Sequence, residues 1–117
     1  MKIPKTQLKN SKIKVWMTKH ALIEYTKDLL GLQIITEDTQ LSRIIGLLKN
    51  SFCGAREYRR KNYVQAIINN NFEGAKYFIN KEFDKDGFLF VVSENNILIT
   101  VYFVSEEKIR RNYVRIK

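Results

Sequence analysis

The sequence predicts an α+β fold in which two N-terminal helices pack on one face of a mainly C-terminal antiparallel β-sheet. Apolar residues recur at helical spacing between positions 18 and 48, and they fill two nearly continuous runs between 88 and 104. Helices on one face of such a sheet make a two-layer sandwich. A chain of 117 residues has room for one core, so we expect a single domain, 1–117.

The N-terminal segment 1–14 carries five lysines, no acidic residue and the only proline of the chain. This composition predicts either a flexible basic arm or a weakly held first strand, and the short apolar run Val15–Met17 would complete that strand.

Two helices follow in the pattern. Thr18 suits the N-cap of the first helix, and Gly31 is placed where a helix commonly ends. Its apolar positions are Ala21, Leu22, Tyr25 and Leu29. Thr36 suits the N-cap of the second helix, beside the acids Glu37 and Asp38 that favour a helix N-terminus. Its apolar stripe is Leu41, Ile44, Ile45 and Leu48.

The second half of the chain predicts strands. The segment 63–68 fits a helix or a strand, because so short an apolar run has no diagnostic period. Asn69–Asn71 and Asp84–Gly87 are expected turns, and Ser93–Asn96 is an expected tight connection, where asparagine tolerates the positive φ of a hairpin turn. The expected strands are 75–79, 88–92 and 97–104.

Composition narrows the functional classes. With one cysteine and one histidine, the chain offers no disulfide framework and no Cys- or His-rich metal site. No apolar run approaches the roughly 20 residues of a membrane span, and no apolar segment follows the basic N-terminus as in a signal peptide. We therefore expect a cytoplasmic protein with no metal, no cofactor and no membrane partner.

The net charge of +9 predicts a polyanionic partner. The excess gathers in three basic blocks, at 2–19, 56–61 and 108–117. Lysine and arginine contact phosphates, and tyrosine stacks on unpaired bases, so this mixture favours single-stranded or looped RNA. The expected RNA-binding residues are Lys19, Arg56, Tyr58, Arg59, Arg60, Lys61, Arg110 and Arg111.

His20 is the one residue that suits acid–base chemistry. It falls in the first turn of the first helix, where the helix dipole favours a bound anion and a neutral imidazole. Cleavage of RNA without metal needs a base for the ribose 2′-hydroxyl, a cation for the phosphate and a proton donor for the leaving oxygen.

Two short motifs resemble a known group. The run Lys19-His20-Ala21-x-x-Glu24 opens the first helix, and the last strand contains Thr100-Val101-Tyr102. The chain thus resembles small bacterial and phage proteins whose helix begins His-Ala-x-x-Arg and whose last strand reads Thr-Val-Tyr. Those proteins are similar to the barnase–EndoU–colicin–RelE group of metal-independent ribonuclease toxins.

The resemblance implies a catalytic role for His20, supporting roles for Thr100 and Tyr102, and a cognate acidic antitoxin or immunity protein. Glu24 stands where the pattern has arginine. Either one of Arg56, Arg59 and Arg60 replaces that cation, or the site is degenerate.

Three functions remain open from the sequence. The first is a toxin-like, metal-independent endoribonuclease that cleaves RNA by 2′-hydroxyl attack. The second is a non-catalytic nucleic-acid-binding protein of a phage or mobile element, which needs the basic blocks and not the histidine. The third is a small interaction or inhibitor protein that binds an acidic protein surface.

Overall fold

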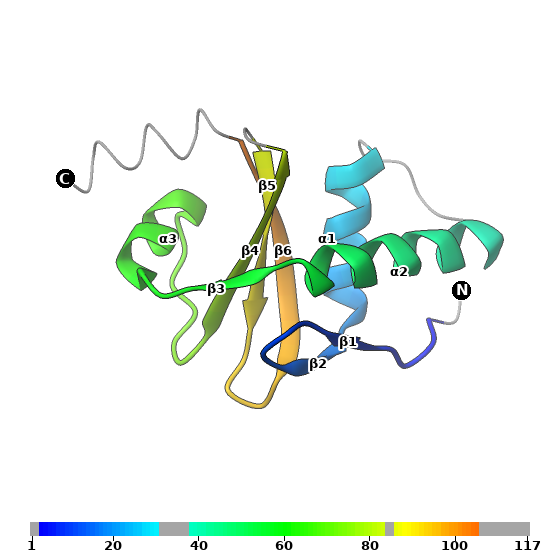
Figure 1. The fold of residues 1–117 in the computed structure, drawn as a ribbon, viewed down its shortest axis with the longest axis horizontal. Helices are drawn as coiled ribbons and strands as arrows, with labels where there is room; N and C mark the ends of the chain where they lie inside the picture. The colour runs from blue at the N-terminus through cyan, green and yellow to red at the C-terminus, as the bar shows by residue number, and fades with distance from the viewer. Residues whose placement is uncertain (1–2, 31–37, 84–85, 106–117) are drawn as a thin grey trace.

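A computed structural model describes residues 3–30, 38–83 and 86–105. Within these residues, six strands form one sheet in the order β1-β2-β6-β5-β4-β3, with three helices packed around it (Figure 1). The strands are β1 (Gln7–Lys9), β2 (Lys14–Met17), β3 (Arg56–Tyr58), β4 (Lys76–Phe83), β5 (Asp86–Val92) and β6 (Ile97–Ser105). The helices are α1 (Lys19–Leu30), α2 (Asp38–Cys53) and α3 (Lys61–Ile68).

The α+β class predicted from the sequence is confirmed, but its finer arrangement is wrong in three respects. Half of the described strands, β1 to β3, precede residue 60. The sheet is mixed, because β2 pairs with β6 in parallel while the other pairs are antiparallel. A third helix, α3, follows β3. Strands of three residues, such as β1 and β3, are too short to show a period of two.

Each face of the sheet carries its own core. The α1/α2 face buries a large cluster that joins both helices to the β1–β2 hairpin and the central strands. The other face, which we call the α3 face, buries a smaller cluster around Val64, Tyr77, Leu89, Val91 and Val104. The central strands β5 and β6 are therefore apolar on both sides, as their sequence indicates.

The local signals are confirmed at several points. The hydroxyl of Thr18 accepts a hydrogen bond from the Ala21 N–H at 3.1 Å, which caps α1. Asn96 has a φ of 59° in the turn between β5 and β6. The expected 84–87 turn is corrected in part, because β5 already begins at Asp86 and Gly87 pairs with Val104. Gly31, Thr36, Glu37, Asp84 and Lys85 lie outside the described residues.

The 1–14 segment contributes strand β1, which agrees with the first-strand alternative for residues 7–9. Contrary to the prediction, Val15–Met17 do not complete this strand but belong to its antiparallel partner β2. The sheet curls so that the β1–β2 turn reaches the strand at its opposite edge (Figure 1). Lys12 of this turn forms an ion pair with Glu57 of β3. None of the helices in the described part of the chain is long and apolar enough to cross a membrane.

Candidate nucleic-acid interface

The β1–β2 hairpin has one apolar face and one basic face. Leu8 and Val15 are opposite each other in register and are 1% and 0% exposed in the core. The neighbouring rungs, Gln7–Trp16 and Lys9–Lys14, have side chains on the other face because strand side chains alternate. The same short strands thus anchor the hairpin and present two lysines to solvent.

The hairpin turn is shaped by Asn10. Its side-chain oxygen accepts hydrogen bonds from the N–H groups of Lys12 at 2.8 Å and Ile13 at 2.9 Å. Such a side-chain-to-backbone turn is the local structure that asparagine favours. It holds the backbone of Lys12 at the tip of the hairpin, next to β3.

The end of α2, which lies beside this hairpin, is held in place by a hydrogen bond from β4. Asn80 of β4 donates a buried hydrogen bond of 2.7 Å from Nδ2 to the carbonyl oxygen of Ser51. A Cβ at Gly54 would lie 3.0 Å from the same Asn80 nitrogen, so glycine permits this approach. Since a carbonyl in the last turn of a helix lacks an intrahelical partner, this bond fixes the end of α2 against the sheet.

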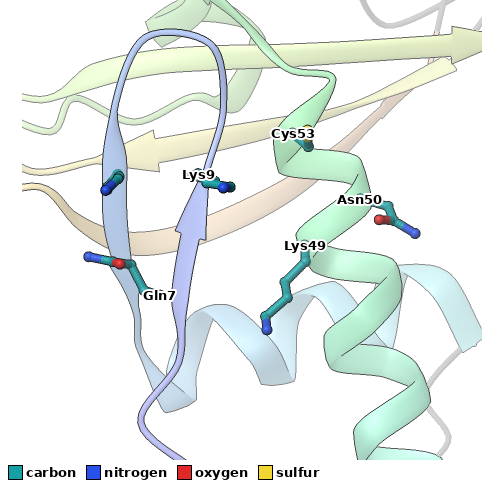
Figure 2. A pocket seen from close by; sticks show the side chains of 6 residues that line it. Gln7, Lys9, Lys49, Asn50 and Cys53 are labelled. Atoms are coloured by element: carbon teal, nitrogen blue, oxygen red, sulfur yellow. The ribbon is translucent and has the colours of Figure 1, made fainter.

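A pocket of about 390 Å³ opens between the hairpin and the last turns of α2. Figure 2 shows Lys9 on β1 and Lys49 on α2, on opposite sides of it. None of its six lining residues is acidic; they are Gln7, Lys9, Lys14, Lys49, Asn50 and Cys53. Three ammonium groups and two amides suit an anion with several acceptor oxygens, such as a phosphodiester.

Next to the pocket, the acid Glu57 is surrounded by positive charge. The hydrogen bond from Lys12 lowers the pKa of Glu57 most, and the charges of Lys12, Arg59 and Lys76 lower it further against the effect of burial. Glu57 is therefore ionised at neutral pH, and its charge balances that of Lys12.

Trp16 is the aromatic residue of this surface. Its side chain is 41% exposed, and the ammonium of Lys5 lies 4.7 Å from the centre of its ring. Ile97 of β6 pairs in register with Trp16 and is also exposed. The ring of Trp16 thus lies on the same face of the hairpin as the Lys9–Lys14 pair, and these are neighbouring positions on that face.

The expected RNA-binding residues fall at several places. Lys19 is exposed at the start of α1, and Arg56, Arg59, Arg60 and Lys61 are exposed on β3 and at the start of α3. Tyr58 is half-buried against the core of the α3 face. Arg110 and Arg111 lie outside the described residues, as does the 106–117 tail.

The three expected catalytic residues do not share a face. His20 is exposed in the first turn of α1, on the α1/α2 face, and its side chain makes no hydrogen bond with a described residue. Thr100 and Tyr102 pair with Val91 and Leu89, whose side chains lie in the core of the α3 face. Directly opposite residues of an antiparallel pair point to the same side, so Thr100 and Tyr102 point away from α1.

The start of α1 is nevertheless fixed against β6. The Thr18 hydroxyl donates to the Leu98 carbonyl oxygen at 2.8 Å, beside an irregularity of register between β5 and β6. Glu24 pairs with Lys27 at 3.5 Å.

Sequence reasoning missed the pocket. It recognised Lys9 and Lys14 only as members of a basic block, and it did not select Trp16 or Lys49. The alternation Lys14-Val15-Trp16 is a signal for one polar and one buried face. The position of Lys49 opposite the hairpin carries no such signal, because it depends on tertiary packing.

No family model, no curated protein and no solved structure matches this chain. Among the described residues, no group of three or more His, Cys, Asp and Glu side chains is arranged to hold a metal ion.

Proposed function

We propose that this protein binds RNA through the surface formed by the β1–β2 hairpin, the end of α2 and the start of α3. The observation that carries the proposal is the Lys12–Glu57 ion pair, which joins two basic blocks from opposite edges of the sheet. Lys9, Lys14 and Lys49 line the pocket beside this junction.

A ribose-phosphate backbone fits this surface better than a small anion does. The lysines of the pocket, Arg56 of β3 and Arg59 just after it extend over several elements, so they can contact consecutive phosphates. Each phosphate neutralised by a lysine or arginine releases counterions, and affinity therefore depends steeply on salt.

The test is a titration of a fluorescently labelled single-stranded RNA in EDTA, by anisotropy, at several salt concentrations. We expect log K to fall linearly with log salt, with a slope of about −0.7 per neutralised phosphate. Binding that is absent, or independent of salt, would overturn the proposal.

A pair of double variants localises the binding. Lys9→Gln/Lys49→Gln removes one charge from each side of the pocket, and glutamine keeps nearly the helix propensity of lysine. The control Lys27→Gln/Arg43→Gln removes the same charge from exposed positions on α1 and α2 that do not line the pocket. In the pocket variant, the salt slope should be smaller in magnitude by about 1.4, since each phosphate contributes about 0.7. The control should keep the slope of the wild type.

RNA cleavage centred on His20 is a second candidate function. The observation that favours it is the bond from Thr18 to β6, which holds the exposed His20 in the first helical turn beside an irregular strand pairing. We propose His20 as the base or acid in a metal-free cleavage that leaves a cyclic phosphate. Lys19 would supply the adjacent cation.

The separation of Thr100 and Tyr102 from the α1 face removes two expected participants from this candidate. Gel analysis of the RNA recovered from the same titration decides between the functions. Intact RNA in EDTA, or equal cleavage by wild type and His20→Ala, rejects cleavage and leaves binding.

An acidic antitoxin or immunity protein, or another acidic protein surface, is the competing partner for the same charges. It would bind the pure protein after nuclease treatment and would compete with RNA in the anisotropy assay. A stable protein complex together with no measurable RNA affinity would select this function instead.

A further inference from the structure

We propose that Trp16 is a stacking platform for an unpaired base, and that the phosphates flanking this base lie in the pocket lined by Lys9, Lys14 and Lys49. This inference rests on the proposed RNA binding and narrows its substrate to single-stranded RNA. It gives a function to the one tryptophan of the chain, whose side chain is 41% exposed beside the lysines of the hairpin.

The register of the hairpin sets the geometry. Trp16 is opposite Gln7, and the next rung on the same face is the Lys9–Lys14 pair. Successive rungs on one face are about 7 Å apart, since each strand residue rises about 3.3 Å. A base on Trp16 and its neighbouring phosphate in the pocket are therefore within the reach of one nucleotide.

The neighbours of the Trp16 ring are suited to a stacked base. Ile97 lies beside Trp16 on the adjacent strand and provides an exposed apolar neighbour. Lys5 lies over the ring, with its ammonium 4.7 Å from the centre. Because exposed cation–π contacts are weaker than base–aromatic stacking, a base can displace this flexible side chain, whose charge then remains next to the RNA backbone.

Single strands are selected because a duplex base is already stacked on its neighbours. Side chains cannot read the deep major groove of A-form RNA, whereas an unpaired base can leave the stack and lie on an aromatic ring. A rigid, strand-borne ring next to lysines matches the composition of single-strand binding surfaces.

The chain offers two built-in reporters for this arrangement. Trp16 is its only tryptophan and Cys53 its only cysteine, and Cys53 is an exposed thiol that lines the pocket. Tryptophan fluorescence therefore reports on the platform alone, and the rate of reaction of Cys53 with a thiol reagent reports on the pocket alone.

The experiment compares three ligands of equal length on the wild-type protein: single-stranded RNA, a blunt RNA duplex and an abasic oligonucleotide. Single-stranded RNA should quench Trp16 fluorescence and slow the reaction of Cys53. The abasic oligonucleotide, which has phosphates without bases, should slow the reaction of Cys53 and leave the fluorescence unchanged. The duplex should quench less than the single strand at equal occupancy.

The matched variants are Trp16→Ala and Ile23→Ala, which truncate two apolar side chains that are each 41% exposed. Trp16→Ala should weaken binding of single-stranded RNA about 5-fold or more, and it should leave affinity for the abasic oligonucleotide unchanged. Ile23→Ala on α1 should bind both like wild type. Equal melting temperatures of the two variants would show that the loss is not one of folding.

The inference is overturned if single-stranded RNA protects Cys53 without quenching Trp16, or if Trp16→Ala and wild type bind it equally. Either result leaves the proposed RNA binding standing. Absence of salt-dependent binding, of quenching and of Cys53 protection together would reject the proposed function as well.

Discussion

The two faces of the β1–β2 hairpin differ in what they do for the molecule. Leu8 and Val15 on the inner face are fully buried beneath α1 and α2, whereas Lys9 and Lys14 on the outer face are exposed and line the pocket. Period-two alternation separates the two sets by a single residue along each strand. The comparison shows how a hairpin of this size can be a structural element and a binding surface at once.

The largest effect should come from the inner face. Leu8→Ala removes a buried side chain and leaves a cavity, so we expect a loss of about 2–5 kcal/mol in the free energy of unfolding. Urea denaturation followed by circular dichroism measures it. The neighbouring Gln7→Ala changes an exposed side chain and should stay within about 0.5 kcal/mol of wild type. If Leu8→Ala were as stable as wild type, the hairpin would not be anchored as described.

Charge reversal on the outer face should separate binding from stability. Lys14→Glu should reduce the magnitude of the salt slope for single-stranded RNA by about 0.7, the value for one phosphate contact. Its urea midpoint should match that of wild type, because Lys14 is exposed. The control is Arg43→Glu on α2, which makes the same charge change outside the pocket. Equal RNA affinity of the two variants would show that net charge, and not the pocket, determines binding.

The smallest effect should come from the Lys12–Glu57 ion pair, which connects the β1–β2 turn to β3. Lys12 lowers the pKa of Glu57 below its ordinary value of 4.5, so the pair stabilises the fold above that pH and loses its effect as pH falls through the lowered pKa. An exposed pair contributes less than about 1 kcal/mol. Urea midpoints of wild type and Glu57→Gln should therefore differ at pH 7 and converge at low pH.

The pKa of Asp28 is also shifted, so the correct measurement is the difference between the urea midpoints of wild type and Glu57→Gln. The pH dependence of either protein alone would include the contribution of Asp28. Burial raises the pKa of Asp28, although its carboxylate accepts a hydrogen bond from the Phe103 N–H at 3.1 Å. A raised pKa in the folded state favours folding at low pH, with the opposite sign to Glu57. This contribution is common to both proteins and cancels. A difference that persists unchanged at low pH would contradict the ion-pair explanation.

Local sequence signals predicted the elements that depend on neighbouring residues. The Thr18 cap and the Asn96 turn follow from backbone preferences within a few positions. The segment 63–68 was ambiguous, and its helix α3 is short and ends at Asn69 with a φ of 53°. Its apolar residues gain their stability from packing on the sheet, which a short window does not reveal.

The candidate site was less predictable because it depends on contacts between distant segments. Trp16 belongs to a strand whose parallel partner is β6, and the position of Lys49 depends on how α2 packs on the hairpin and sheet. Charge counting located the basic blocks but could not show that the β1–β2 turn would meet β3. The resemblance to a known group placed His20 with Thr100 and Tyr102, whose separation from His20 follows from strand register.

The parallel pairing of β2 with β6 also sets the order in which the molecule can assemble. Thr18 and Leu98, joined at this seam, are 80 positions apart in the chain. Contacts between such distant segments form slowly and only after β6 has been synthesised. The parallel pairing that holds the β1–β2 hairpin against β6 is therefore among the last contacts of the described sheet to form.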